Sequence, residues 1–144
     1  MHDLVAYKQH PDMIGKSSRL ASQKFEEIKK GDQIVYYARK DMVVTGIFEV
    51  ISERTQVEND PYWNDYPYGK SMTIYKIKPV AMPLKGYYLD FKKLVMDPSV
   101  RLDTFPRESR WGGYIQGRTC ISLTDRDLLT IRNALSNMNY LKSM

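Results

Sequence analysis

Two neighbouring stretches of β-branched and aromatic residues, joined by only two residues, limit what this chain can fold into. Residues 33–39 (QIVYYAR) and 42–53 (MVVTGIFEVISE) have the composition of strands, and Lys40 with Asp41 forms the connection between them. They therefore predict a β-hairpin. Because the second stretch is apolar along most of its length, we expect it to be buried on both sides or to bend around a barrel at Gly46.

Helical patterns lie on both sides of this hairpin. Residues 17–32 predict a helix with Ser17 or Ser18 as its N-cap and Gly31 at its end, and its inward face holds Ala21, Phe25 and Ile28. Residues 124–135 predict a final helix that begins at Thr124, with Asp127 three residues later as a variant of the capping box. The buried stripe of that helix is Leu128, Ile131 and Leu135.

The middle of the chain alternates between strand, helix and loop patterns. In residues 73–82, Tyr75 and Ile77 share one strand face and Lys76 and Lys78 the other, so one face is exposed to water. Residues 87–97 predict a short helix, 98–118 a long irregular connection with three arginines before Trp111, and 120–123 a short strand. The inward residues of the short helix are Phe91, Leu94 and Val95.

The order of these elements favours an α+β domain containing a small mixed barrel. With 144 residues, 42% of them hydrophobic, the chain can bury a single core, and we expect residues 1–144 to form one domain. No apolar run approaches the roughly 20 residues needed to cross a bilayer, and residues 1–10 lack a signal-peptide pattern, so a cytoplasmic location is expected.

The sequence offers little for metal or cofactor chemistry. Cys120, His2 and His10 are too few for a structural zinc site, and Cys120 is expected to be a buried thiol, so we predict no metal and no cofactor. Phosphate-binding, dinucleotide-binding, zinc-protease and serine-hydrolase motifs are absent. The formal charge of +5 favours a polyanionic partner only mildly.

Residues 60–69 (DPYWNDYPYG) combine four aromatic rings with residues that favour turns. The segment is therefore predicted to be a surface loop. Its rings can either cover the protein's own core or form a wall on which a flat ligand stacks, and both roles are open for Trp63.

Four segments, taken in order, resemble the EVE domain family, a member of the PUA-like superfamily related to YTH domains. They are KKGDQIVYY, VTGIFEVISE, YKIKPV and SRWGGYIQGRTCISLTDRDLLTIRNAL, and the resemblance covers about Ile28 to Leu135. It implies a small curved or closed β-barrel flanked by helices. It also implies a pocket of aromatic walls and polar groups that accepts a base flipped out of its strand, often a modified base.

The resemblance also suggests which residues form that pocket. Trp63 and Tyr62 fall where relatives place an aromatic wall, and Met13 or Ile14 stands where a second aromatic is usual and would form an apolar wall. Trp111 has a binding or a packing role. Ser17 or Ser18 could present a hydroxyl or amide group at a helix N-terminus. The expected phosphate contacts are Lys16, Arg19, Arg110 and Arg118.

These expectations lead to a non-catalytic module that binds RNA or DNA, possibly with modified bases, and that needs neither metal nor membrane. An alternative is an enzyme, because PUA-like relatives of the ASCH type are associated with nuclease or hydrolase activity through lysine and carboxylate groups at the barrel mouth. Another alternative is a protein-interaction domain that uses the aromatic loop as its hot spot.

Overall fold

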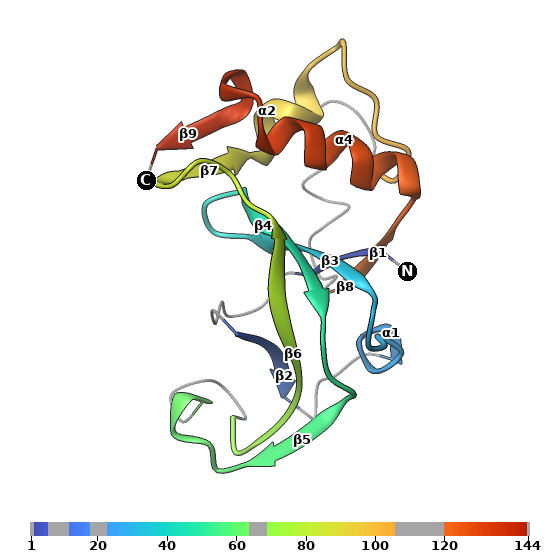
Figure 1. The fold of residues 1–144 in the computed structure, drawn as a ribbon, viewed down its shortest axis with the longest axis vertical. Coiled ribbons are helices and arrows are strands. Elements are labelled where there is room, and N and C mark those ends of the chain that lie inside the picture. Colours follow the sequence, from blue (N-terminus) through green and yellow to red (C-terminus); the bar gives the residue numbers. More distant parts are fainter. Residues whose placement is uncertain (1, 6–11, 18–22, 64–68, 106–119, 144) are drawn as a thin grey trace.

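The computed structural model of the protein describes residues 2–5, 12–17, 23–63, 69–105 and 120–143. Within them the chain forms a mixed α+β fold with one sheet of nine strands and few helices (Figure 1). The strands are β1 (His2–Val5), β2 (Met13–Ser17), β3 (Gln33–Ala38), β4 (Val43–Val50), β5 (Thr55–Glu58), β6 (Ser71–Ala81), β7 (Tyr87–Asp90), β8 (Cys120–Leu123) and β9 (Leu141–Ser143). The α-helices are α1 (Gln23–Glu26), α2 (Phe91–Met96) and α4 (Asp125–Leu135), and the 3-10 helices are η1 (Pro61–Trp63) and η3 (Met138–Tyr140).

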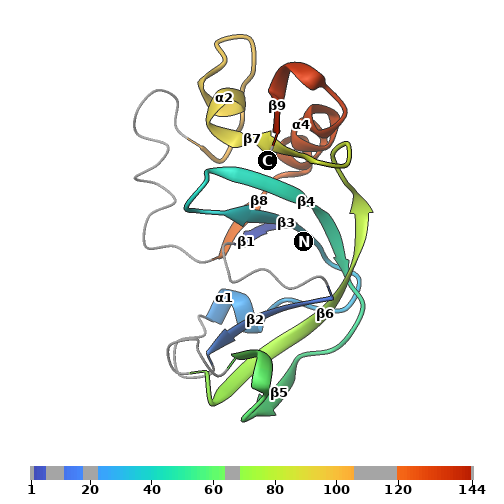
Figure 2. The same cartoon turned by 90° about the vertical axis from the view of Figure 1, so that its left-hand side faces the viewer.

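The sheet is mainly antiparallel, and only the pairing of β1 with β3 is parallel among the described strands. Its main path runs β2-β6-β4-β3-β1-β8, with β5 added to β6 and the β7–β9 pair added to β4. Figures 1 and 2 show the long strands β4 and β6 curving between the two ends of the molecule. The α+β class is thus confirmed, while in the described residues the path from β2 to β8 is not shown to close into a barrel.

The expected hairpin is present as β3 and β4, and seven of the eight residues of β4 are buried, as its apolar sequence predicts. The register shifts between Tyr36 and Tyr37, where the chain of β4 carries Thr45 as the extra residue, and the Thr45 hydroxyl donates to the carbonyl of Tyr36 at 3.4 Å. Gly46 follows at once. A β-carbon there would lie 3.1 Å from the carbonyl oxygen of Ala81 and would collide with the sulfur of Met82, so β6 can approach β4 closely only at a glycine.

The helices cover opposite faces of the sheet, so the expectation of a single core is wrong. On one face, Leu128, Ile131 and Leu135 of α4 pack with Val35 and with residues of α2. On the other face, Phe25 and Ile28 pack with the neighbouring Ile34 and with residues from β2, β4, β6 and β8. Successive residues of β3 point to opposite faces, which is why one strand contributes to both clusters. Figure 2 shows α4 and α1 on the two sides of β3 and β4.

The helix predicted over residues 17–32 is wrong for most of its described length. Ser17 is the last residue of β2 and pairs with Met72, and α1 itself covers four residues, so Ser17 is not the N-cap of α1. Phe25 and Ile28 are nonetheless buried as expected. The stretch after α1 is held by strand partners instead, because the amide of Gly31 donates to Val50 and that of Val50 donates to Asp32. Ser18 and Ala21 lie outside the described residues.

The predictions for the residues after the hairpin agree better with the structure. Tyr75 and Ile77 are buried and Lys76 and Lys78 are exposed as expected, although Thr73 and Ile74 are both buried. Residues 120–123 form β8. The helix predicted over 87–97 is right only from Phe91 onward, because Tyr87–Asp90 pairs as β7 with β4 and with β9, a strand that the sequence did not reveal. In α4 the Thr124 hydroxyl accepts from the amide of Asp127 at 3.1 Å, which confirms this cap.

Candidate functional site

Strands β5, β6 and β2 lie side by side, and their register decides which side chains can meet. Gln56 pairs with Thr73, and Thr73 pairs with Lys16, so these three residues lie abreast on one face of the sheet. Because Tyr75 follows Thr73 by two residues and packs against Phe25 of α1, we call this face the inner face. The opposite side of the same three strands, which carries Gly15 and Ile74, is called the outer face.

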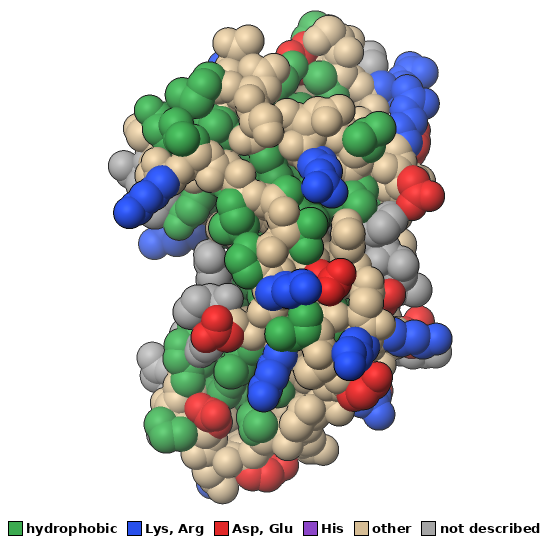
Figure 3. All heavy atoms as spheres, viewed as in Figure 1, with side chains coloured by type: hydrophobic (Ala, Val, Ile, Leu, Met, Phe, Trp, Pro, Cys, Tyr) green, Lys and Arg blue, Asp and Glu red, His purple; other side chains and the backbone are tan. Residues whose placement is uncertain are grey.

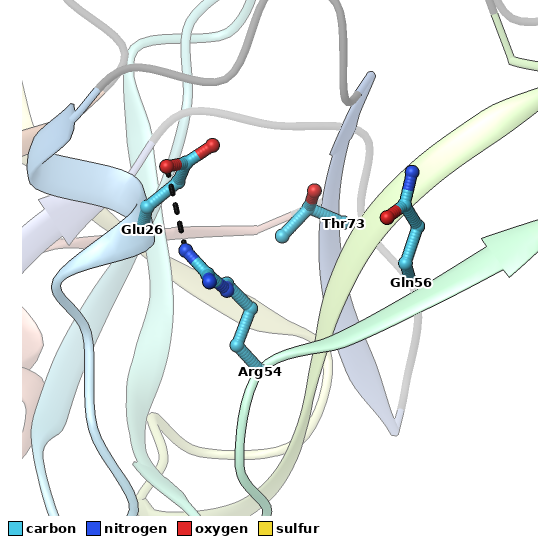
Figure 4. Close-up of a pocket in the computed structure, with 4 residues that line it drawn as sticks. All are labelled: Glu26, Arg54, Gln56 and Thr73. Atoms are coloured by element: carbon cyan, nitrogen blue, oxygen red, sulfur yellow. Dashed lines mark ion pairs between the residues drawn. The ribbon is translucent and has the colours of Figure 1, made fainter.

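The inner face is hollowed beside α1. The hollow has a volume of about 420 Å³ and is lined by Glu26 of α1, Arg54 just before β5, Gln56 of β5 and Thr73 of β6 (Figure 4). All four side chains are polar. The hollow can therefore offer a ligand both hydrogen-bond donors and acceptors.

An ion pair closes one side of the hollow. A guanidinium nitrogen of Arg54 lies 3.3 Å from a carboxylate oxygen of Glu26, and Figure 4 shows the second oxygen of Glu26 turned away from Arg54. Both side chains are about half exposed, with exposed fractions of 53% and 43%, so water screens the pair and both groups are accessible to a ligand.

Behind the hollow, Tyr75 fixes the position of α1. Its hydroxyl donates to the carbonyl of Phe25 at 2.7 Å, and its ring meets the Phe25 ring edge-on at 5.3 Å. Burial raises the pKa of Tyr75 to about 12, with smaller and partly opposing effects from Arg54 and Glu26. Tyr75 is therefore a neutral donor near neutral pH, and it holds the helix that supplies Glu26.

At the far side of the hollow, a hydrogen-bond relay sets the orientation of the Gln56 amide. The Ser71 hydroxyl donates to Glu58 at 2.9 Å, and the Gln56 amide nitrogen donates to the Ser71 oxygen at 2.8 Å. An ionised carboxylate only accepts, so the single hydroxyl proton of Ser71 is used on Glu58 and Ser71 must accept from Gln56. The amide oxygen of Gln56 is thereby turned toward Thr73, as Figure 4 shows.

Lys16 adjoins the hollow from β2 and is in an unusual electrostatic position. Burial, and secondarily the like charge of Arg39 at the end of β3, lowers the pKa of the Lys16 ammonium group. A partly desolvated lysine near a second cation would be stabilised by an anion, because an anion offsets both effects. Of the four phosphate contacts suggested from the sequence, Lys16 is the one that lies among the described residues.

Trp63 lies on the outer face instead. Its exposed fraction is 0%, and it packs with Met72, Ile74 and the half-buried Met13 and Tyr62. The Tyr62 ring meets the Trp63 ring edge-on at 4.7 Å. Asp60 begins this turn of 3-10 helix, since its carboxylate accepts from the amide of Tyr62 at 2.9 Å and its carbonyl from that of Trp63 at 3.0 Å. Of the two roles open for Trp63, the burial of the ring favours covering the core.

The residues suggested from the sequence are thus divided between the two faces. Trp63, Tyr62 and Met13 come together on the outer face, whereas Ile14 is buried against the inner-face cluster and Lys16 adjoins the hollow. The backbone of Ser17 ends β2. Ser18, Arg19, Arg110, Trp111 and Arg118 lie outside the described residues.

The sequence reasoning missed the residues that line the hollow. Thr73 could have been placed, because it lies two residues before Tyr75 in the alternating strand. Arg54 and Gln56 precede or belong to β5, a strand of four mostly exposed residues whose composition gives little β signal. Glu26 lines the hollow, and the charge of Arg39 acts on Lys16, only because the tertiary fold brings distant segments together.

Other parts of the described chain offer less. A second hollow of about 210 Å³ lies beside α4, lined by Leu94, Val100, Thr130, Asn133, Ala134, Asn137 and Tyr140. Among the described residues no group of three or more His, Cys, Asp or Glu side chains is placed to hold a metal ion. None of the helices in that part of the chain has the length and apolarity that a membrane span requires. Figure 3 shows basic and acidic side chains interspersed over the face it views. Among the described residues, Lys78 and Glu49 form an ion pair at 3.5 Å.

Comparison with protein families gives one match. Residues 8–113 match the EVE domain. This region begins earlier and ends earlier than the resemblance noted from the sequence motifs. It contains Lys16, Arg39 and all four residues that line the hollow on the inner face. No curated protein matches the chain.

Proposed function

Since the chain belongs to the EVE domain family, which is PUA-like, we propose that it is a non-catalytic module that binds single-stranded RNA or DNA through one flipped-out base, possibly a modified one. The observation that carries the proposal is the polar hollow on the inner face, bordered by the partly buried Lys16. Base edges are read by hydrogen bonds and backbones by cations, so a hollow with donors and acceptors beside a lysine suits a nucleotide.

In this proposal Lys16 and Arg39 contact the phosphate group beside the inserted base. Their like charges already oppose each other in the unliganded protein, so a phosphate anion relieves a repulsion as well as forming new contacts. Arg19, Arg110 and Arg118 remain proposed contacts to neighbouring phosphates. A lysine or arginine on a phosphate contributes affinity without regard to sequence.

Trp63 has a supporting role in the proposal. Its ring packs behind the same three strands whose inner face carries Lys16, Thr73 and Gln56, so it keeps the floor of the hollow rigid. A stacking role for Trp63 would require the side chains that bury it to move. Base stacking in the hollow is therefore not assigned to Trp63.

Binding of a labelled single-stranded oligonucleotide, measured by fluorescence anisotropy, tests the proposal. We expect Thr73→Val to weaken binding, because a methyl group replaces the hydroxyl in the hollow. The matched control is Thr55→Val on β5, since Thr55 pairs with Ile74 and lies on the outer face. Equal affinity of the two variants and the unaltered protein would contradict the proposed site.

The same samples address the enzymatic alternative. A non-catalytic module leaves the oligonucleotide intact after prolonged incubation, with and without added divalent cations. Fragments that appear with the unaltered protein and disappear with Glu26→Gln would instead identify a nuclease that uses the carboxylate of the hollow.

A further inference from the structure

The chemistry of the hollow narrows the kind of base that fits it, and this inference rests on the proposed function. Two of its groups are fixed as acceptors. The carboxylate of Glu26 only accepts hydrogen bonds when ionised, and the relay through Ser71 and Glu58 turns the amide oxygen of Gln56 into the hollow. Arg54 contributes a fork of donors and no acceptor.

The hollow therefore presents two acceptor groups and one cationic donor group, together with the Thr73 hydroxyl, which can do either. A complementary base edge has two donor groups and one acceptor. The Watson–Crick edge of guanine has N1–H and N2–H₂ as donors and O6 as acceptor. Adenine, cytosine and uracil or thymine each offer only one donor group on that edge.

From this pattern we infer that the hollow selects a guanine-type edge, with Glu26 and Gln56 accepting from the ring and amino nitrogens and Arg54 donating to the carbonyl oxygen. The Arg54–Glu26 ion pair supports this reading, because the pair at 3.3 Å presents a donor next to an acceptor, as neighbouring O6 and N1–H require. Ser71 and Glu58 act as positioning residues, since they touch Gln56 and not the base.

The amino group at the 2-position is the feature that separates guanine from hypoxanthine. A site that accepts from both N1–H and N2–H₂ loses one partner when inosine replaces guanosine, and an acceptor covered by the bound base is then left unmatched. The predicted order of affinity is thus guanosine, then inosine, then the other nucleotides.

Competition with nucleoside 5′-monophosphates against a labelled oligonucleotide measures this order. We expect guanosine monophosphate to compete at a concentration roughly 10- to 100-fold below that of adenosine or cytidine monophosphate, the discrimination typical of a good bidentate contact. Inosine monophosphate should lie between them.

Two variants distinguish a loss of base recognition from a loss of folding. Glu26→Gln should abolish the preference for guanine, because an amide brings a donor to the position that must accept. Ser71→Ala replaces none of the four residues that line the hollow but frees the Gln56 amide to turn, so it should reduce the preference for guanosine over inosine while the oligonucleotide still binds. Thr55→Val on the outer face is the matched control and should keep the full order.

The outcomes distinguish this inference from the proposed function. Equal competition by all monophosphates, or a preference for adenine or cytosine, would overturn the guanine edge while nucleic-acid binding stands. An unchanged preference in Glu26→Gln would also overturn it. If neither the oligonucleotide nor any monophosphate binds, the proposed function fails together with the inference.

Discussion

Gly15 of β2 lies directly against the ring of Trp63, so that a β-carbon at position 15 would come within 2.9 Å of Cζ2 and 3.1 Å of Cη2 of the indole. The distance to Cζ2 is shorter than real β-carbon contacts show, and those to Cη2 and to Ile74, at 3.0 Å, are so tight that the neighbouring side chains would have to shift. The buried ring and the glycine thus form one packing unit on the outer face.

This contact predicts the effect of Gly15→Ala. The added methyl group overpacks a buried site, and we expect a loss of about 1–3 kcal/mol in the free energy of unfolding, measured by urea denaturation. Trp63→Phe supplies the control, because a smaller ring leaves room for the methyl group. Gly15→Ala should therefore cost less in the Trp63→Phe background, and an equal cost in both backgrounds would contradict the contact.

Trp63→Ala should mainly affect stability. Removing a fully buried aromatic ring is expected to lower the free energy of unfolding by about 3–5 kcal/mol. Oligonucleotide affinity of the folded fraction should stay nearly unchanged, because the ring lies on the outer face. A loss of about 1–3 kcal/mol in binding with little loss of stability would instead show that Trp63 stacks on a base.

Asp127 should be important for stability although it lies far from the hollow. Its carboxylate is fully buried and accepts from the amide of Asp103 at 2.6 Å, the amide of Thr104 at 3.0 Å and the Thr104 hydroxyl. Asp127→Asn replaces one accepting oxygen with an NH₂ group that faces the donors of Asp103 or Thr104. The change should cost about 1–3 kcal/mol in the free energy of unfolding. The same change at the exposed Asp125, in the same helical turn, should cost about 0.3–1 kcal/mol through the helix dipole. Equal losses would contradict the role of Asp127.

Burial of Tyr75 and Tyr37 predicts a loss of stability at high pH. The pKa of each phenol is raised from its ordinary value of 10.0 to about 12, because burial disfavours the phenolate. Their contribution to stability is complete below pH 10 and is lost as the pH rises to about 12, since the unfolded chain releases these protons first. Urea midpoints measured from pH 9 to 12 should fall, and less steeply in Tyr75→Phe. A slope unaffected by Tyr75→Phe would exclude Tyr75 as a cause.

The sequence predicted those elements whose signals are local. The hairpin of β3 and β4, the alternation of Tyr75 and Lys76, and the Thr124 cap all depend on residues a few positions apart. Strands β1, β2, β5 and β9 were missed because each is short and is stabilised by pairing with distant segments.

The site could be predicted only in part for a related reason. Aromatic content drew attention to the turn predicted over residues 60–69, but the face on which Trp63 lies depends on the register of β2 against β6. A shift of one residue in that register would exchange the two faces, and no local pattern fixes it. Lys16, which the sequence suggested as a phosphate contact, lies on the inner face beside the hollow, and its role at a phosphate stays a prediction. Glu26 reaches the hollow, and the charge of Arg39 acts on Lys16, through long-range packing.

The salt dependence of oligonucleotide binding tests the central claim most directly, namely that Lys16 and Arg39 hold a phosphate beside the inner-face hollow. The logarithm of the affinity should fall linearly with the logarithm of salt concentration, and each phosphate contact adds about 0.7 to the slope for a single strand. Lys16→Met and Arg39→Met should each flatten this slope, as should Arg110→Ala and Arg118→Ala. Lys92→Met on α2, an exposed lysine on another element, should leave it unchanged. If Lys16→Met gives the same slope as Lys92→Met and the unaltered protein, the account of the site is contradicted.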